Sequence, residues 1–134
     1  MLSVFPTLLI FQFMAPTILR VALGVIFLNF GITKIGRQRA SKAVFFETIG
    51  MKPGINYVWI IGILEIILGL CFIAGFLTQV VAIIAIIILA ISIKLKKSHS
   101  DSFESSSGYL WLCLIIALSL LISGPGWMAI DLPL

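Results

Sequence analysis

Residues 55–93 read INYVWIIGILEIILGLCFIAGFLTQVVAIIAIIILAISI, and this stretch decides the fold. Glu65 is its one charged residue, and the stretch is nearly twice as long as the roughly 20 helical residues that cross a bilayer core of about 30 Å. A more polar interruption that begins at Gly75 divides it, because glycine ends a helix and Thr78 suits the N-cap of the next one. The sequence therefore predicts a hairpin of two membrane-spanning helices, 55–74 and 78–95.

Apolar stretches on either side of this hairpin predict two further spans. Pro16, which suits the first turn of a helix, opens a span at 16–35. A second span at 108–123 is closed by Gly124-Pro125-Gly126, because glycine ends a helix and proline prevents its continuation. The predicted fold class is an all-α integral membrane protein, a four-transmembrane-helix bundle that forms a single membrane domain over residues 1–134.

The composition of the whole chain excludes a water-soluble globule. Of 134 residues, 61% are hydrophobic and 10% are charged, against roughly 45–50% and about 25% in an ordinary soluble domain. Five acidic and nine basic residues cannot coat a soluble core of this size, so apolar surface has to face lipid. No Lys or Arg precedes the first apolar run, so we expect no cleaved signal peptide and place residues 4–14 along the membrane interface.

The basic residues gather in two connections and predict the orientation in the membrane. By the positive-inside rule, the loops 34–53 and 94–107 face the cytoplasm, and both termini face outward. Apolar residues within the first loop predict a short interfacial helix, either as an anchor or as a docking site for a cytoplasmic partner. The second loop is rich in serine around a lone His99, so we expect a polar linker there and no metal site. The basic residues of the two loops are Lys34, Arg37, Arg39, Lys42, Lys52, Lys94, Lys96 and Lys97.

Two ionisable residues, Arg20 and Glu65, lie within the predicted spans, where a charge exposed to lipid costs about 2.5–3.5 kcal/mol. At 100° per residue, each shares one helix face with two glycines, and glycines at such positions let two helices approach closely. We predict that the first two spans pack along these faces and that Arg20 pairs with Glu65, directly or through one water. The residues that share the two faces are Arg20, Gly24, Phe27, Gly31 and Lys34 on the first span, and Gly62, Glu65 and Gly69 on the second.

The predicted pair has a structural and a functional interpretation. In the structural interpretation, the pair fixes which helix faces pack, and removing one partner lowers the stability by about 3–5 kcal/mol. As a site, a carboxylate at the membrane midplane carries a proton or binds a polar ligand headgroup. Asn29 lies on the opposite face and is expected to hydrogen-bond another helix, whereas Lys34 is expected to extend from its helix end to the interface.

Redox groups are not predicted within this chain. Cys71 and Cys113 differ in expected depth by roughly 15 Å, so a disulfide is excluded and both are interpreted as packing residues. The sequence has no CxxC motif and no histidine pair within a span. We therefore expect no metal site and no cofactor held covalently or by metal ligands.

Four short motifs occur in order along the chain: Arg20-Val-Ala-Leu-Gly24-Val-Ile-Phe27 with Gly31 and Lys34, Gly50-Met51-Lys52-Pro53, Glu65 with Gly69 and Gly75, and Gly124-Pro125-Gly126-x-x-Ala129-Ile130-Asp131. Taken together, they resemble the DoxX family from about Arg20 to Asp131. The chain departs from the family at Ala129, where serine is usual, which removes a hydroxyl from the last motif. Arg20, Lys34, Glu65 and Asp131 match the polar motif residues of the family.

The resemblance implies a four-helix protein of the bacterial or archaeal cytoplasmic membrane. Some DoxX-like proteins are described as subunits of quinone-linked thiosulfate-oxidising complexes or terminal oxidases, and others as membrane anchors of assemblies that join a soluble detoxifying enzyme to a sulfur-handling enzyme. It therefore implies a membrane subunit of a redox, oxidative-stress or sulfur-metabolism complex, at most an oxidoreductase subunit, with quinone or quinol as its cofactor. Expected partners are the lipid bilayer and soluble redox or sulfur-handling enzymes, and no nucleic acid.

Two other functions remain open on the sequence, as do the substrate, the redox partner and the oligomeric state. One is a non-catalytic scaffold or assembly factor in which the charged pair is purely structural. The other is a small proton-coupled transporter. It ranks lowest, because four-span multidrug transporters carry their carboxylate in the first helix, whereas Glu65 lies in the second predicted span next to an available arginine. Asp131 is either a second acid that bridges to Arg20 and folds the tail over the mouth of the bundle, or a solvated side chain; Trp127 would anchor that tail at the interface.

Overall fold

The structure is a computed structural model that describes residues 11–12, 14–99, 106–124, 126 and 129–130. In this part of the chain all regular secondary structure is helical, which confirms the predicted all-α class. Three helices are long and apolar enough to cross a membrane, and the apolar helix α5, with 17 residues, is shorter. The helices are α1 (Met14–Ile35), α2 (Arg39–Thr48), α3 (Gly54–Ala74), α4 (Thr78–Ser98) and α5 (Ser107–Ser123).

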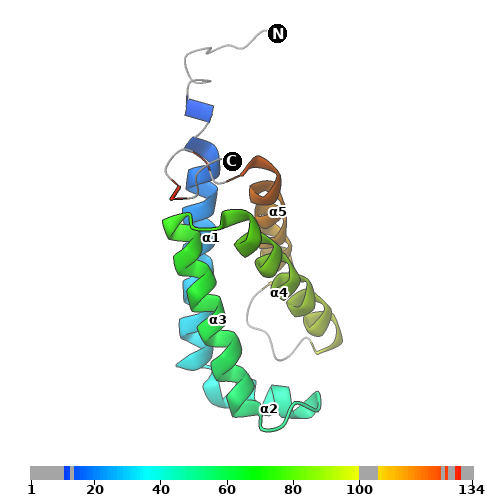
Figure 1. Cartoon of the computed structure of the whole chain (residues 1–134). Helices are drawn as coiled ribbons and strands as arrows, with labels where there is room; N and C mark the ends of the chain where they lie inside the picture. The colour runs from blue at the N-terminus through cyan, green and yellow to red at the C-terminus, as the bar shows by residue number, and fades with distance from the viewer. Residues whose placement is uncertain (1–10, 13, 100–105, 125, 127–128, 131–134) are drawn as a thin grey trace.

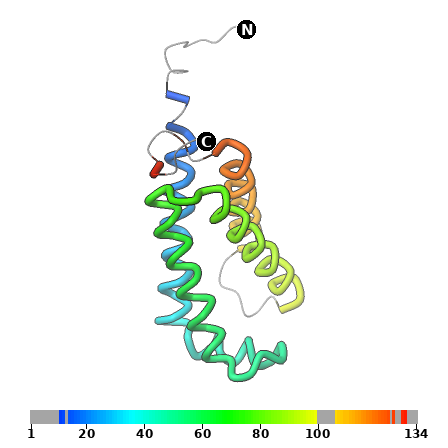
Figure 2. Tube along the Cα trace, viewed as in Figure 1, coloured from blue at the N-terminus to red at the C-terminus, as the bar shows by residue number. Residues whose placement is uncertain are grey.

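The long helices form two antiparallel pairs. Helix α1 packs mainly against α3, and α4 packs mainly against α5, whereas contacts between the two pairs are few. Figure 1 shows the two pairs close together near the α3–α4 turn and farther apart toward α2, which lies across the lower end. The Cα trace in Figure 2 shows the same divergence. We refer to the two ends of the bundle as the turn end and the α2 end.

The glycine faces predicted for the first two spans form the contact between α1 and α3. A Cβ atom on Gly24 would lie 2.8 Å from the backbone oxygen of Gly69, and one on Gly31 would lie 2.6 Å from the backbone oxygen of Gly62. No larger residue fits without moving a helix, so the two backbones touch at two points seven residues apart. This contact fixes the register of α1 against α3.

The turn between α3 and α4 uses two left-handed residues, Gly75 with φ 70° and Leu77 with φ 48°. Gly75 is the C-cap of α3, as predicted, because glycine adopts this conformation without a Cβ penalty. The predicted N-cap Thr78 is wrong: Leu77 occupies that position and Thr78 is the first residue of α4. The Thr78 side chain is completely buried in the bundle, so it belongs to the packed face of α4.

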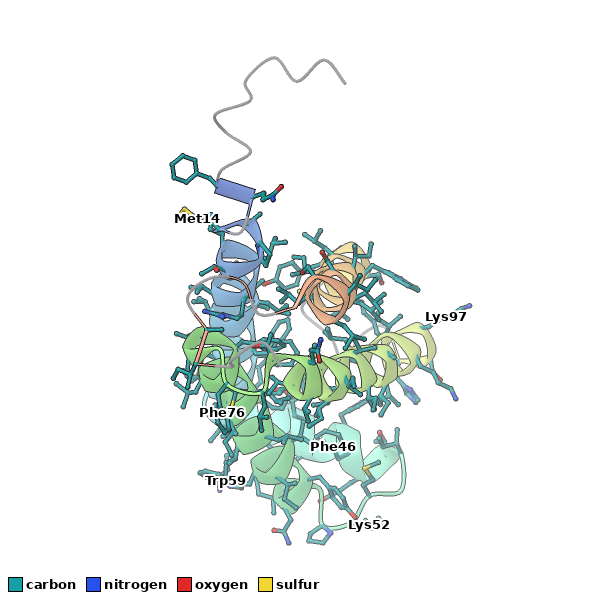
Figure 3. The ribbon with its side chains drawn as sticks, turned by 45° about the horizontal axis from the view of Figure 1, so that its top comes forward. Met14, Phe46, Lys52, Trp59, Phe76 and Lys97 are labelled. Carbon is teal, nitrogen blue, oxygen red and sulfur yellow. The ribbon has the colours of Figure 1, made fainter. Side chains whose placement is uncertain are left out.

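The short helix predicted between the first two spans is α2. Its buried face carries Phe45 and Phe46, which pack with Val58 of α3, while Val44 is exposed. Figure 3 places Phe46 where α2 meets α3, and Lys97 extends from the far end of α4. At the other end of the bundle Gly124, with φ 77°, is the C-cap of α5, as predicted.

Candidate functional site

A cavity of about 520 Å³ lies where the two helix pairs diverge, toward the α2 end. Apolar and aromatic side chains form part of its wall, and a row of charged, amide and hydroxyl groups forms the rest. Every helix contributes to this wall. The lining residues are Phe27, Asn29, Phe30, Thr33, Lys34, Gln38, Lys42, Glu65, Ile88, Leu89, Ser92, Ser106, Tyr109 and Leu110.

The charged centre of the cavity is an ion pair between Lys34 of α1 and Glu65 of α3. The Lys34 Nζ donates a hydrogen bond to Glu65 Oε1 at 2.5 Å, and the two side chains are 16% and 4% exposed. Both residues follow a glycine of the α1–α3 contact by one turn, Lys34 after Gly31 and Glu65 after Gly62. The close approach of these backbones therefore brings the pair together within the bundle.

Lys34, not Arg20, is thus the cation that Glu65 meets, and the predicted Arg20–Glu65 pair is corrected. The prediction that the Lys34 side chain extends to the interface is also wrong, because its Nζ binds Glu65 within the bundle. Side chains on a helix tilt toward its N-terminus. On the antiparallel helices α1 and α3, Lys34 and Glu65 therefore lean toward each other, while Arg20 leans away toward the turn end.

Arg20 occupies a second polar position at the turn end. Its side chain is 1% exposed, and its guanidinium lies directly against Gly75, where a Cβ would collide with it. The Cα of Ala129 would lie 2.9 Å from the same Cβ, so Ala129 also packs at this point. Because Gly75 is ten residues along α3 from Glu65, about 15 Å, the two polar positions are separate.

The second carboxylate oxygen of Glu65 marks where a ligand could bind. Glu65 Oε2 is buried and has no hydrogen-bond partner within the described residues. A buried polar atom left without a partner costs roughly 1–3 kcal/mol. A hydroxyl group, an amide or a water that enters the cavity would recover this energy by donating to Oε2.

Lys42 is a cavity residue that the sequence analysis assigned only to membrane orientation. Its side chain is 7% exposed, and its Nζ lies 6.0 Å from the centre of the Phe45 ring. Lys42 precedes Phe45 and Phe46 by three and four residues, so it shares their buried face of α2. This spacing was the signal in the sequence that α2 directs one lysine inward.

Residues of α4 and α5 that line the cavity were also missed by the sequence analysis. Ser92, Ser106 and Tyr109 add hydroxyl groups to the wall, and the Tyr109 ring meets the Phe30 ring edge to face at 5.8 Å. A tyrosine and isolated serines carry no sequence signal that separates a cavity wall from an ordinary helix surface. Their placement depends on how the α4–α5 pair lies against α1.

The remaining predicted residues are placed as follows. Asn29 accepts a hydrogen bond from Thr33 of its own helix at 3.3 Å and lines the cavity, which corrects the expectation of a bond to another helix. Cys71 is half-buried and Cys113 buried, and both are free thiols. Among the residues that the structure describes, no group of three His, Cys, Asp or Glu side chains could hold a metal ion. The motif residues Pro125 and Asp131 lie outside the described residues, as does Trp127.

Comparison with known proteins identifies a family to which this chain is similar. The family model described as DoxX matches residues 15–97, a range that contains Arg20, both partners of the ion pair and the whole glycine contact. The last motif, around Gly124-Pro125-Gly126, lies beyond this match. No curated protein and no solved structure matches the chain. The match covers more than half of the sequence and agrees with the motifs and the helical membrane architecture, so this chain belongs to the DoxX family.

Proposed function

We propose that this protein is a membrane subunit of a redox assembly, and that the cavity between its helix pairs binds the headgroup of a lipid-soluble quinone. The observation that carries the proposal is the combination, in one cavity, of a buried ion pair, an unpartnered carboxylate oxygen and aromatic rings. When bound, a quinone would carry electrons and protons between a partner enzyme and the membrane.

The residues present fit a quinone headgroup in size and chemistry. A cavity of about 520 Å³ lies within the 300–1,000 Å³ that is usual for small-molecule sites. The Lys34 ammonium and the Tyr109 hydroxyl are donors for carbonyl oxygens, and Glu65 Oε2 is an acceptor for a ring hydroxyl. The Phe27 and Phe30 rings supply flat apolar surface against which a ring can pack.

The surroundings of the cavity favour the rest of the proposal. The exposed cations of the described residues lie at the α2 end, which supports a cytoplasmic position of that end and two outward termini. The same end offers charged surface to a soluble redox or sulfur-handling enzyme that would deliver or receive the electrons. We place the assembly in the cytoplasmic membrane of a bacterium or an archaeon. The exposed cations are Arg37, Arg39, Lys52, Lys94 and Lys97.

Quinone binding by the purified protein tests this proposal. Two tail-less or short-tailed probes, menadione and ubiquinone-1, are titrated into protein in mild detergent, and the quenching of tryptophan fluorescence is followed. Ser92→Phe places a ring in the cavity and is expected to weaken binding at least about tenfold, a loss of about 1.4 kcal/mol. The matched control is Ile91→Phe, because Ile91 is 53% exposed. Absence of binding by the unmodified protein, or equal binding by Ser92→Phe, would refute the proposal.

The glycine contact and the completed ion pair also favour a second candidate, a scaffold in which the pair only holds α1 against α3. The double variant Lys34→Met/Glu65→Leu separates the two functions. A scaffold should still copurify with its partner proteins when the pair is replaced by apolar side chains of similar size. A quinone-binding subunit should keep its fold and lose the bound quinone, measured by mass spectrometry of the lipid-soluble molecules that copurify.

A further inference from the structure

The polar part of the cavity wall connects Glu65 with one end of the bundle. From the ion pair toward the α2 end, the wall presents Ser92, Lys42, Gln38 and Ser106. Ser106 is exposed and Gln38 is half-buried, and both lie at helix starts outside the apolar helices, so the polar wall reaches the surface of the protein at the α2 end. Groups of this kind can hold a chain of hydrogen-bonded waters in a cavity of this volume.

The opposite side of Glu65 is packed with apolar side chains. Leu23, Phe27 and Phe72 are completely buried, and the Phe27 and Phe72 rings pack with their centres 5.9 Å apart. Ala82 of α4 and Leu120 of α5 complete this layer, also without exposure. Close-packed apolar layers exclude water, so hydrogen-bonded access to Glu65 from the turn end is interrupted there.

We propose that Glu65 exchanges protons with one compartment only, the one at the α2 end. In this step a hydronium ion in the cavity transfers its proton to Glu65 Oε2 and leaves as water, so that the carboxylate becomes a carboxylic acid, and release is the reverse. Glu65 Oε1 remains the acceptor for Lys34. Among the described residues, the titratable groups that share the cavity with Glu65 are Lys34 from α1, Lys42 from α2 and Tyr109 from α5, and α4 contributes the Ser92 hydroxyl as its polar group. The inference goes beyond the proposed function, because it holds whether or not the ligand of the cavity is a quinone.

Dicyclohexylcarbodiimide, an apolar reagent that modifies protonated carboxyl groups, provides the test. The protein is reconstituted in vesicles, the pH on each side is set separately, and modification of the Glu65 peptide is measured by mass spectrometry shortly afterwards. Lys52→Cys, at an exposed position and in a Cys71→Ala/Cys113→Ala background, reports by impermeant maleimide labelling which side carries the α2 end. Glu65→Gln controls for modification elsewhere in the peptide.

The expected result is modification that follows the pH on the α2 side, by up to about tenfold per pH unit, and does not respond to the other side. Ser92→Phe, which blocks the polar route, should reduce this response, while Ile91→Phe should leave it unchanged. Modification that follows the turn-end pH or both sides equally, or no modification at any pH, overturns the inference. One-sided modification without quinone binding would refute the proposed function and leave this inference standing.

Discussion

Removing the two partners of the Lys34–Glu65 pair one at a time is expected to cost unequal amounts of stability. Lys34→Met leaves a carboxylate whose side chain is 4% exposed, and an uncompensated charge at such a position costs about 3–5 kcal/mol. Glu65→Leu leaves an ammonium that is 16% exposed and carried on a long flexible stem near the α2 end. Because this group can turn toward water, the expected cost is smaller, about 1–3 kcal/mol.

The double variant separates the true partner of Glu65 from the one that the sequence suggested. Lys34→Met/Glu65→Leu should regain much of the summed loss, with a coupling energy of about 1–3 kcal/mol, because neither charge is left behind. Arg20→Met with Glu65→Leu should be additive within about 0.5 kcal/mol. The Arg20 guanidinium lies against Gly75, about 15 Å along α3 from Glu65, whereas Glu65 accepts its hydrogen bond from Lys34.

Equilibrium unfolding in mixed micelles with a rising fraction of dodecyl sulfate, followed by circular dichroism, gives the three free-energy differences that each cycle needs. An Arg20–Glu65 coupling energy that equals or exceeds the Lys34–Glu65 coupling energy would refute this pairing. A smaller cost for Lys34→Met than for Glu65→Leu would show that the burial of the two side chains does not control the loss.

Two further comparisons use glycines in matched pairs, with the same unfolding measurement. Gly31→Ala should lower the free energy of unfolding by about 1–3 kcal/mol, because its Cβ would lie 2.6 Å from a backbone oxygen of α3 that cannot rotate away. The control Gly108→Ala should cause no loss, because the nearest neighbour of its Cβ would lie at 3.9 Å. Equal losses would contradict the close contact. Gly75→Ala should destabilise the protein more than Gly50→Ala, because both glycines have positive φ but only Gly75 faces the Arg20 guanidinium. This difference in the free energy of unfolding should shrink when Arg20→Met is added. An unchanged difference would exclude Arg20 as its cause.

The sequence was sufficient to predict the helical class, the short helix α2 and the contact faces of α1 and α3, because these depend on local periodicity. Gly24, Gly31, Gly62 and Gly69 identify the two faces through a spacing of seven residues, and the structure places them against one another. The end of α3 at Gly75 could also be predicted from the local sequence, since a left-handed C-cap favours glycine.

The choice between Arg20 and Lys34 was not determined by the same reasoning. The two cations share one face of α1, and a face gives a direction around the helix axis but no position along the partner helix. With the glycines in register, Glu65 lies at a level between the two cations. The tilt of side chains toward each helix N-terminus then selects Lys34, so this pair could have been predicted by adding side-chain direction to periodicity.

The two halves of the cavity differ in how firmly they are held, and this difference bears on function. The charged partners lie on α1 and α3, which touch backbone to backbone, so their relative position is fixed by contacts that no side-chain rotation can relieve. The hydroxyl groups of Ser92 and Tyr109 lie on the α4–α5 pair, which makes few contacts with the first pair. A ligand or partner protein that displaces α4 and α5 would therefore change the width of the cavity and its polar route to the α2 end, while the ion pair at its centre stayed in place.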